Sequence, residues 1–135
     1  MEEMVRVGVR ELPDVGALAS LGDGKLSVLL WHYHDDDVAG LNAKIRLRLE
    51  ALPNRNGEAR LRHFRIDETH SNSFATWQRM GSPRMPTTTQ YQELERAGHL
   101  QEMEPPRAAR IEDGTMRLEF ELPRQAVSLL EIGLP

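Results

Sequence analysis

Apolar and polar residues alternate along several short segments of this chain, which is the pattern of β-strands with one buried and one solvated face. The alternation covers residues 5–9, 45–49 and 116–122. The run at residues 26–31 is instead apolar at nearly every position. That run predicts a strand near the middle of a sheet, covered on both of its faces.

Turn residues separate the other strand candidates. Two glycines and an aspartate at residues 21–24 supply the positive φ angles of a tight hairpin between strands at 17–20 and 25–33. The same reasoning predicts further strands and turns in the rest of the chain. The turns fall at 54–57 and 113–114, and the strands at 59–67, 109–112 and 126–132.

Between residues 70 and 98 the apolar residues recur with the spacing of α-helices. Asn72 is placed as the N-cap of a first helix, which Gly81 ends. One face of that helix carries Phe74, Trp77 and Met80, a spacing more typical of core anchors than of exposed residues. We therefore expect this face to be buried.

A second helix follows. Thr87 and Gln90 have the spacing of a capping box, and Gly98 is placed to end the helix in a left-handed cap. About seven strands and two helices predict a mainly β fold, an antiparallel β-sandwich of fibronectin/immunoglobulin-like type. We expect a single domain over residues 1–135, with a two-helix insertion at about 70–98.

The composition excludes several classes of function. With 39% hydrophobic residues, 28% charged residues and a net charge of −4, the 135-residue chain is typical of an ordinary soluble domain. It contains no cysteine, and no apolar run approaches the roughly 18 residues of a membrane helix. We expect no nucleic acid, no membrane and no cofactor as partners. The opening residues 1–4 lack the features of a secretory signal, which predicts a cytoplasmic location.

One local cluster has the residue types of a metal site. His32 and His34 share a strand face, so their imidazoles and the Asp35 carboxylate are candidate ligands of a divalent cation in a small metal-dependent enzyme. The alternative is a solvated end of the strand, with the aspartates facing Arg46 and Arg48. A closed site also needs a remote ligand, and no residue of the sequence identifies one.

Glycoside hydrolysis requires two carboxyl groups, and the acidic residues here are not arranged to provide them clearly. Glu119 and Glu121 share one strand face, and Glu68 lies near His70, but alternating glutamates are usually the polar face of a strand. We therefore assign no catalytic residue. Trp31, Tyr33, Phe74 and Trp77 are instead candidate contacts for a carbohydrate or for a protein interface.

Several motifs along the chain are similar to those of a known protein family. The motifs lie at residues 13–19, 31–37, 65–77, 80–87 and 122–130. Together they make almost the whole chain similar to the C-terminal β-sandwich accessory domain of glycoside hydrolase family 39 β-xylosidases, relatives of α-L-iduronidase. The resemblance implies a (β/α)₈ catalytic barrel as partner, with an Asn-Glu-Pro acid/base motif and retaining hydrolysis of xylosides in xylan degradation.

None of that barrel is recognised in this chain. The nearest string, Met103-Glu104-Pro105, lacks the asparagine, so no catalytic residue is carried over. We expect the chain alone to be inactive and to act as an accessory domain or fragment. A free carbohydrate-binding module for xylose or xylo-oligosaccharides is the alternative.

The resemblance also implies two contact surfaces. In this family the sandwich borrows a strand from the segment before the barrel, so one sheet edge would be exposed here and open to homo-oligomerisation. The helical segment at 70–98 is rich in aromatic residues and methionine, which are favoured at interface cores. It is a hypothesis that this segment docks the sandwich to a barrel.

Overall fold

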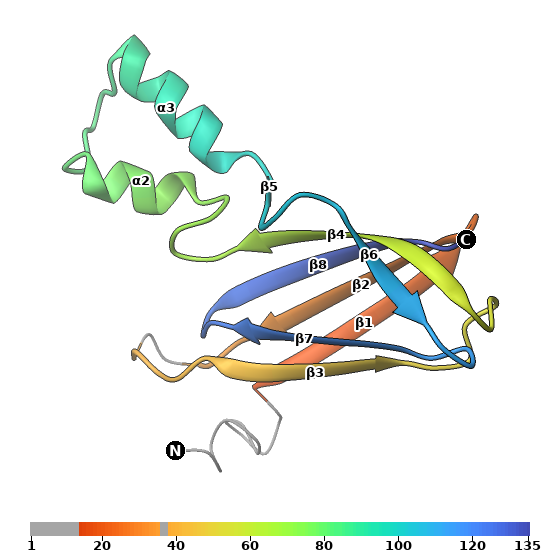
Figure 1. Ribbon diagram of the computed structural model, residues 1–135. Coiled ribbons are helices and arrows are strands. Elements are labelled where there is room, and N and C mark those ends of the chain that lie inside the picture. Colours follow the sequence, from red (N-terminus) through yellow and green to blue (C-terminus); the bar gives the residue numbers. More distant parts are fainter. Residues whose placement is uncertain (1–13, 36–37) are drawn as a thin grey trace.

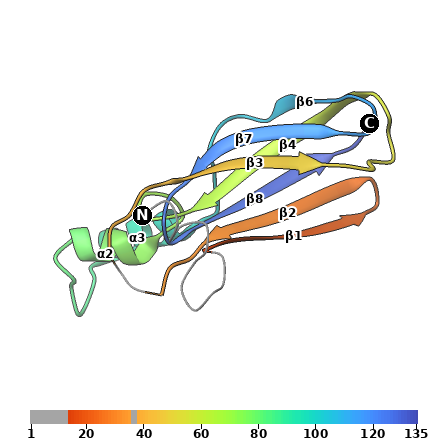
Figure 2. The same ribbon diagram turned by 90° about the horizontal axis from the view of Figure 1, so that it is seen from below.

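A computed structural model describes residues 14–35 and 38–135. The strand expected at residues 5–9 lies outside the described residues. The rest forms two antiparallel sheets packed face to face, with the helices at one end of the sandwich and the C-terminus at the other (Figures 1 and 2). The predicted β-sandwich with a helical insertion is confirmed.

The larger sheet has six strands, in the order β1-β2-β8-β4-β5, with β6 also pairing with β4. These strands are β1 (Val15–Gly22), β2 (Lys25–His32), β4 (Gly57–Ile66), β5 (Gln101–Glu102), β6 (Arg107–Ile111) and β8 (Ala126–Gly133). The smaller sheet contains only β3 (Ala43–Leu49) and β7 (Met116–Leu122). Six strands opposite two differ from the three and four strands of an immunoglobulin constant-type domain, so that finer likeness is not confirmed.

Two tight turns of the same type connect consecutive strands, one within the β1–β2 hairpin and one between β6 and β7, which lie in different sheets. Asp23 and Gly24 between β1 and β2 have φ angles of 51° and 71°, and Asp113 and Gly114 before β7 have 48° and 73°. Two successive positive φ angles match the twist of the flanking strands, and the second falls on glycine, which adopts them at no steric cost. The predicted turns are therefore confirmed.

The core lies between the two sheets and is built from alternate positions. In β2 the inward residues Leu26, Val28 and Leu30 are buried, whereas Leu29 on the outer face is 37% exposed. The expectation that residues 26–31 are covered on both faces was therefore wrong. A two-layer sandwich has one core, and no element of the described chain covers the outer face of this strand.

The insertion consists of α2 (Ser73–Arg79) and α3 (Thr88–Gly98). The Asn72 cap and the Thr87–Gln90 capping box are both present, as predicted. Two details were wrong. Gly98 has no positive φ, and the chain leaves α3 in an extended conformation at His99. The face of α2 expected to be buried is only partly so: Phe74 is 62% exposed and Trp77 and Met80 are half-buried, because α2 packs mainly on α3 rather than on the sandwich.

No helix among the described residues has the length and apolar character needed to cross a membrane.

Candidate functional site

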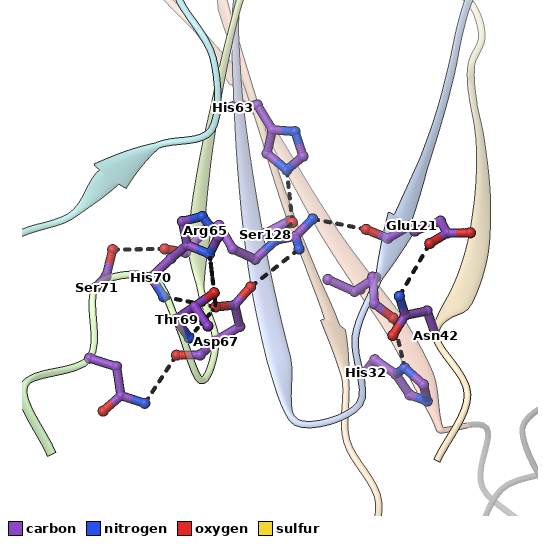
Figure 3. A network of polar contacts seen from close by, with 12 residues as sticks. His32, Asn42, His63, Arg65, Asp67, Thr69, His70, Ser71, Glu121 and Ser128 are labelled. Carbon is purple, nitrogen blue, oxygen red and sulfur yellow. Dashed lines mark hydrogen bonds and ion pairs between the residues drawn. The ribbon is translucent and has the colours of Figure 1, made fainter. Parts of the chain in front are cut away.

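A buried polar network lies where β4, β7 and β8 meet near the insertion (Figure 3). Arg65 is 3% exposed, and its Nε atom donates to the Ser128 hydroxyl at 2.8 Å while its NH2 group donates to the Glu121 carbonyl at 2.9 Å. The Ser128 hydroxyl also shares a hydrogen bond with His63 Nε2, 2.8 Å away, whose direction depends on the tautomer of the imidazole. The network therefore joins strands of both sheets.

The same arginine connects the sandwich to the chain that enters the insertion. Its NH1 group lies 3.5 Å from the Asp67 carboxylate, whose Oδ1 atom accepts hydrogen bonds from the backbone N–H groups of Thr69 and His70 at 2.8 Å. Ser71 donates to the Arg65 carbonyl at 2.7 Å. The turn that leads into α2 is thus held by the end of β4.

Burial explains the ionisation of this network. Burial, reinforced by the charge of Arg65, lowers the pKa of His63 from 6.5 to about 4. Burial also lowers the pKa of Arg65, against the attraction of Asp67. For Asp67, burial alone would raise the pKa, but hydrogen bonds from His70 and Thr69 lower it overall. The network therefore contains a neutral imidazole beside a guanidinium–carboxylate pair.

The sequence-based predictions did not include this network, although the strand pattern carries a signal for it. His63 and Arg65 occupy the inward phase of β4 set by Leu61, and Ser128 occupies the inward phase of β8 set by Leu130. Polar residues at core positions of a strand are normally hydrogen-bonded to one another or to the backbone. The partners come from three strands far apart in sequence, so spacing alone does not pair them.

The three candidate metal ligands differ in burial and in their hydrogen-bond partners. His32 is fully buried and its Nδ1 atom donates to the Leu122 carbonyl at 3.0 Å. His34 is 2% exposed and its Nδ1 atom lies 3.1 Å from the buried Asp14 carboxylate. Asp35 is exposed and accepts a hydrogen bond from Tyr33. Within residues 14–35 and 38–135, no group of three or more histidine and carboxylate side chains is arranged to hold a metal ion.

The candidate aromatic contacts fall in two places. Trp31 lies over Gly16 on the outer face of the β1–β2 hairpin and is half-buried, while Tyr33 at the end of β2 is 60% exposed. On α2, Phe74 is 62% exposed and stacks on Trp77 with ring centroids 5.6 Å apart. Trp77 is half-buried and donates from its indole N–H to the Pro83 carbonyl at 3.0 Å.

The acidic pairs lie on solvated surfaces. Glu119 sits 3.7 Å from Arg46 across the β3–β7 pair, and Glu121 accepts a hydrogen bond from Asn42 at 3.2 Å. Glu68 is exposed at the end of β4. These contacts are those of a polar strand face.

Two hollows flank the region. A cleft of about 630 Å³ lies between the start of α2 and the turn after β7, and its lining includes Phe74, Ile66 and Arg124. A larger groove of about 1010 Å³ lies between the edge strands β1 and β3. Its apolar lining includes Val15, Ala17, Leu30, Leu41, Ile45 and Leu47.

Solved structures share this fold. The chain superimposes on the GH39 enzyme from Xanthomonas axonopodis pv. citri with a TM-score of 0.75 at 18% identity, over 89% of this chain and 26% of that chain. A monomeric β-xylosidase from Caulobacter crescentus CB15 gives a TM-score of 0.66 at 17% identity, over 87% and 26%. A bacterial orthologue of human α-L-iduronidase gives 0.66 at 21% identity, over 90% and 22%. A comparison with curated proteins finds no match.

These likenesses define the class: a β-sandwich of the kind found within larger glycoside hydrolases. The model of the glycosyl hydrolases family 39 matches residues 12–116, which is most of the chain. The chain therefore belongs to glycosyl hydrolase family 39. It spans about a quarter of the length of the solved structures that it matches.

Proposed function

We propose that this chain is a non-catalytic accessory domain of a family-39 β-xylosidase and that it packs against a (β/α)₈ catalytic barrel. The observation that carries the proposal is the groove between β1 and β3. A six-stranded sheet faces a two-stranded one, so the inward side of β1 has no strand opposite it among the described residues. Ala17 and Leu21, which face inward on β1, are exposed for this reason.

The groove has the properties of a site that another segment of the enzyme covers. Its floor is apolar, with Ile45 and Leu47 from β3 opposite Ala17 from β1. The free edge of β3 offers main-chain hydrogen-bonding groups along seven residues. A strand added to this edge would bury the apolar floor and extend the smaller sheet, as in other cases of strand addition.

The insertion offers a second surface to the same partner. Phe74, Met85, Tyr91 and Leu100 are between 51% and 89% exposed. Trp77 is only half-buried, so part of its side chain is accessible to a partner. Exposed aromatic side chains and methionine are favoured at the centres of protein interfaces. The buried Arg65 network would hold this surface in a fixed position relative to the sheets.

The first test is enzymatic. The purified chain is incubated with a nitrophenyl xyloside, and nitrophenol release is followed against a mock preparation. We expect no turnover, because Glu68, Glu119 and Glu121 lie on solvated surfaces. Sustained turnover would overturn the proposal.

A chimera tests the docking directly. This chain replaces the sandwich of the Caulobacter β-xylosidase, and the yield of soluble, active enzyme is measured. We expect Ala17→Arg in the groove to lower that yield strongly, because the charged side chain would occupy the docking surface. Ala108→Arg on β6 is the matched control, since Ala108 is also an exposed strand alanine and lies outside the groove. Equal yields for the two variants would contradict docking at the groove.

A free carbohydrate-binding module is the second candidate, and the cleft beside Phe74 favours it. An exposed aromatic ring with amide and carboxylate neighbours is a common surface for binding a pyranose. Titration of the chain with xylose and xylobiose tests this candidate. Saturable binding that Phe74→Ala removes would support the module, and no heat of binding would exclude it for these sugars.

A further inference from the structure

The outer edge of the larger sheet is formed by β1, which pairs only with β2 among the described residues. All eight residues of β1 are uncharged and none is proline. Leu18 is 65% exposed and Leu21 is 52% exposed. Free edges are normally protected by charges, prolines or bulges, and β1 carries neither a charge nor a proline.

The hairpin turn decides which backbone groups of β1 are free. In a hairpin with a two-residue turn, the residues that flank the turn, here Gly22 and Lys25, exchange hydrogen bonds, and every second pair repeats this. The hydrogen bond from Tyr33 N to Asp14 O, 2.8 Å long, follows the same alternation one pair beyond the strand. The N–H and C=O groups of the remaining residues of β1 therefore point away from β2. These residues are Val15, Ala17, Ala19 and Leu21.

Two other edge strands, β3 and β6, are less suited to pairing with a second copy. The edge strand β3 carries Lys44, Arg46 and Arg48 on its exposed face. Antiparallel pairing of two copies of β3 would place these cations opposite one another, which is destabilising. The edge strand β6 carries exposed Arg107 and Arg110. Only β1 among these three edges lacks like-charge repulsion.

We propose that two copies of this chain associate through antiparallel pairing of β1 with β1 about a two-fold axis, which joins the two larger sheets into one. In the register that places Leu18 opposite Leu18 of the second copy, Val15 meets Leu21 and Ala17 meets Ala19. Each residue whose backbone groups point away from β2 is thus opposite another such residue. Main-chain hydrogen bonds can therefore form between the two copies on both sides of the axis. This inference does not depend on a catalytic barrel.

An edge-to-edge contact between single strands is smaller than a standard interface of about 1,200–2,000 Å². The dimer is therefore expected to exchange with monomer and to depend on concentration. Analytical ultracentrifugation of the full chain should show the mass rising from 15.4 kDa toward twice that value as the concentration increases. A constant monomer mass up to the solubility limit would overturn the proposal.

Charge variants of Leu18 test the register. Leu18→Lys and Leu18→Glu should each be monomeric, because like charges would face each other across the axis. An equimolar mixture of the two should recover the dimer. Leu100→Lys is the control, since Leu100 is an exposed leucine outside β1 and its substitution should leave the dimer unchanged. A dimer that persists in either Leu18 variant alone, or a mixture that stays monomeric, would refute this pairing.

Amide hydrogen exchange gives a readout that needs no substitution. The amides of Ala17 and Ala19 point away from β2, so their exchange should slow as the concentration of the unmodified chain increases. The amides of Leu18 and Ser20 are already bonded within the hairpin and serve as internal controls. Exchange at Ala17 and Ala19 that does not change with concentration would exclude β1 as the interface.

Discussion

The two margins of this sandwich differ in how their strands are held together. At the β4–β6–β7 margin, the chain passes directly from one sheet to the other through the turn at Asp113 and Gly114. Both the apolar core and the Arg65 network join the sheets on this side. At the β1–β3 margin, the longer segment between β2 and β3 leads from one sheet to the other, its residues Gly40 to Asn42 line the groove, and Ala17 and Leu21 remain exposed.

The difference shows which margin of the domain is closed by the domain's own packing and which margin has a surface available for binding. A margin closed by core packing and a buried network contributes the domain's own stability. An open margin with free strand edges contributes little to that stability and is available for binding. Substitutions should therefore affect folding at the first margin and association at the second.

The largest expected effect is the loss of Arg65. Arg65→Leu would leave Asp67 and the Glu121 carbonyl without their buried donor, so we expect the free energy of unfolding to fall by about 4 kcal/mol. Arg62→Leu is the control on the same strand, because Arg62 is partly exposed and pairs with Glu102 and Glu131 at the surface. Its loss should cost about 1 kcal/mol or less. Urea denaturation measures both, and equal losses would refute the structural role of the network.

Core truncation compares the two margins directly. Leu130 is 1% exposed in the core, and Leu130→Ala should lower the free energy of unfolding by about 3 kcal/mol through lost burial and the remaining cavity. Leu21→Ala at the open margin removes the same atoms from a side chain that is 52% exposed, and should cost only about 0.5 kcal/mol. Similar shifts of the urea midpoint would show that the open margin is packed in solution.

The pH dependence of stability sharpens the comparison further. The pKa of His63 is lowered from 6.5 to about 4 in the folded protein, so its contribution is complete above pH 6.5. As the pH falls from 6.5 to 4, the unfolded chain takes up the proton first, and stability is lost progressively. The loss should be about 2 kcal/mol, below the value of the full shift because the ring keeps some solvent contact. His63→Gln should flatten this part of the unfolding profile, and an unchanged slope would contradict the assignment.

The smallest effect concerns the link between the closed margin and the insertion. Asn72 Oδ1 accepts a hydrogen bond from Ala75 N at 2.9 Å, and Asn72→Ala should cost about 1 kcal/mol. Ser73→Ala at the next position, which is exposed, should change stability by no more than a few tenths. Thermal unfolding followed by circular dichroism compares the two variants. Equal melting temperatures would show that α2 unfolds independently of the sandwich.

Local patterns predicted most elements of the fold. The turn residues at 21–24 and 113–114, the alternation at 45–49 and 116–122, and the Asn72 cap each depend on neighbours within a few residues. The errors arose where packing between residues far apart in sequence determines the structure. The face of α2 that carries Phe74 has the spacing of a core face, but α2 packs mainly on α3, so Phe74 stays exposed.

The candidate site divides in the same way. The sequence by itself determined which segments alternate and where the chain turns. Only the tertiary structure decided that His63, Arg65 and Ser128 face inward and meet, and that β1 and β3 are left with free edges around a groove. Strand order and sheet size depend on contacts between residues far apart in sequence, and period-two alternation carries no information about which strands become neighbours.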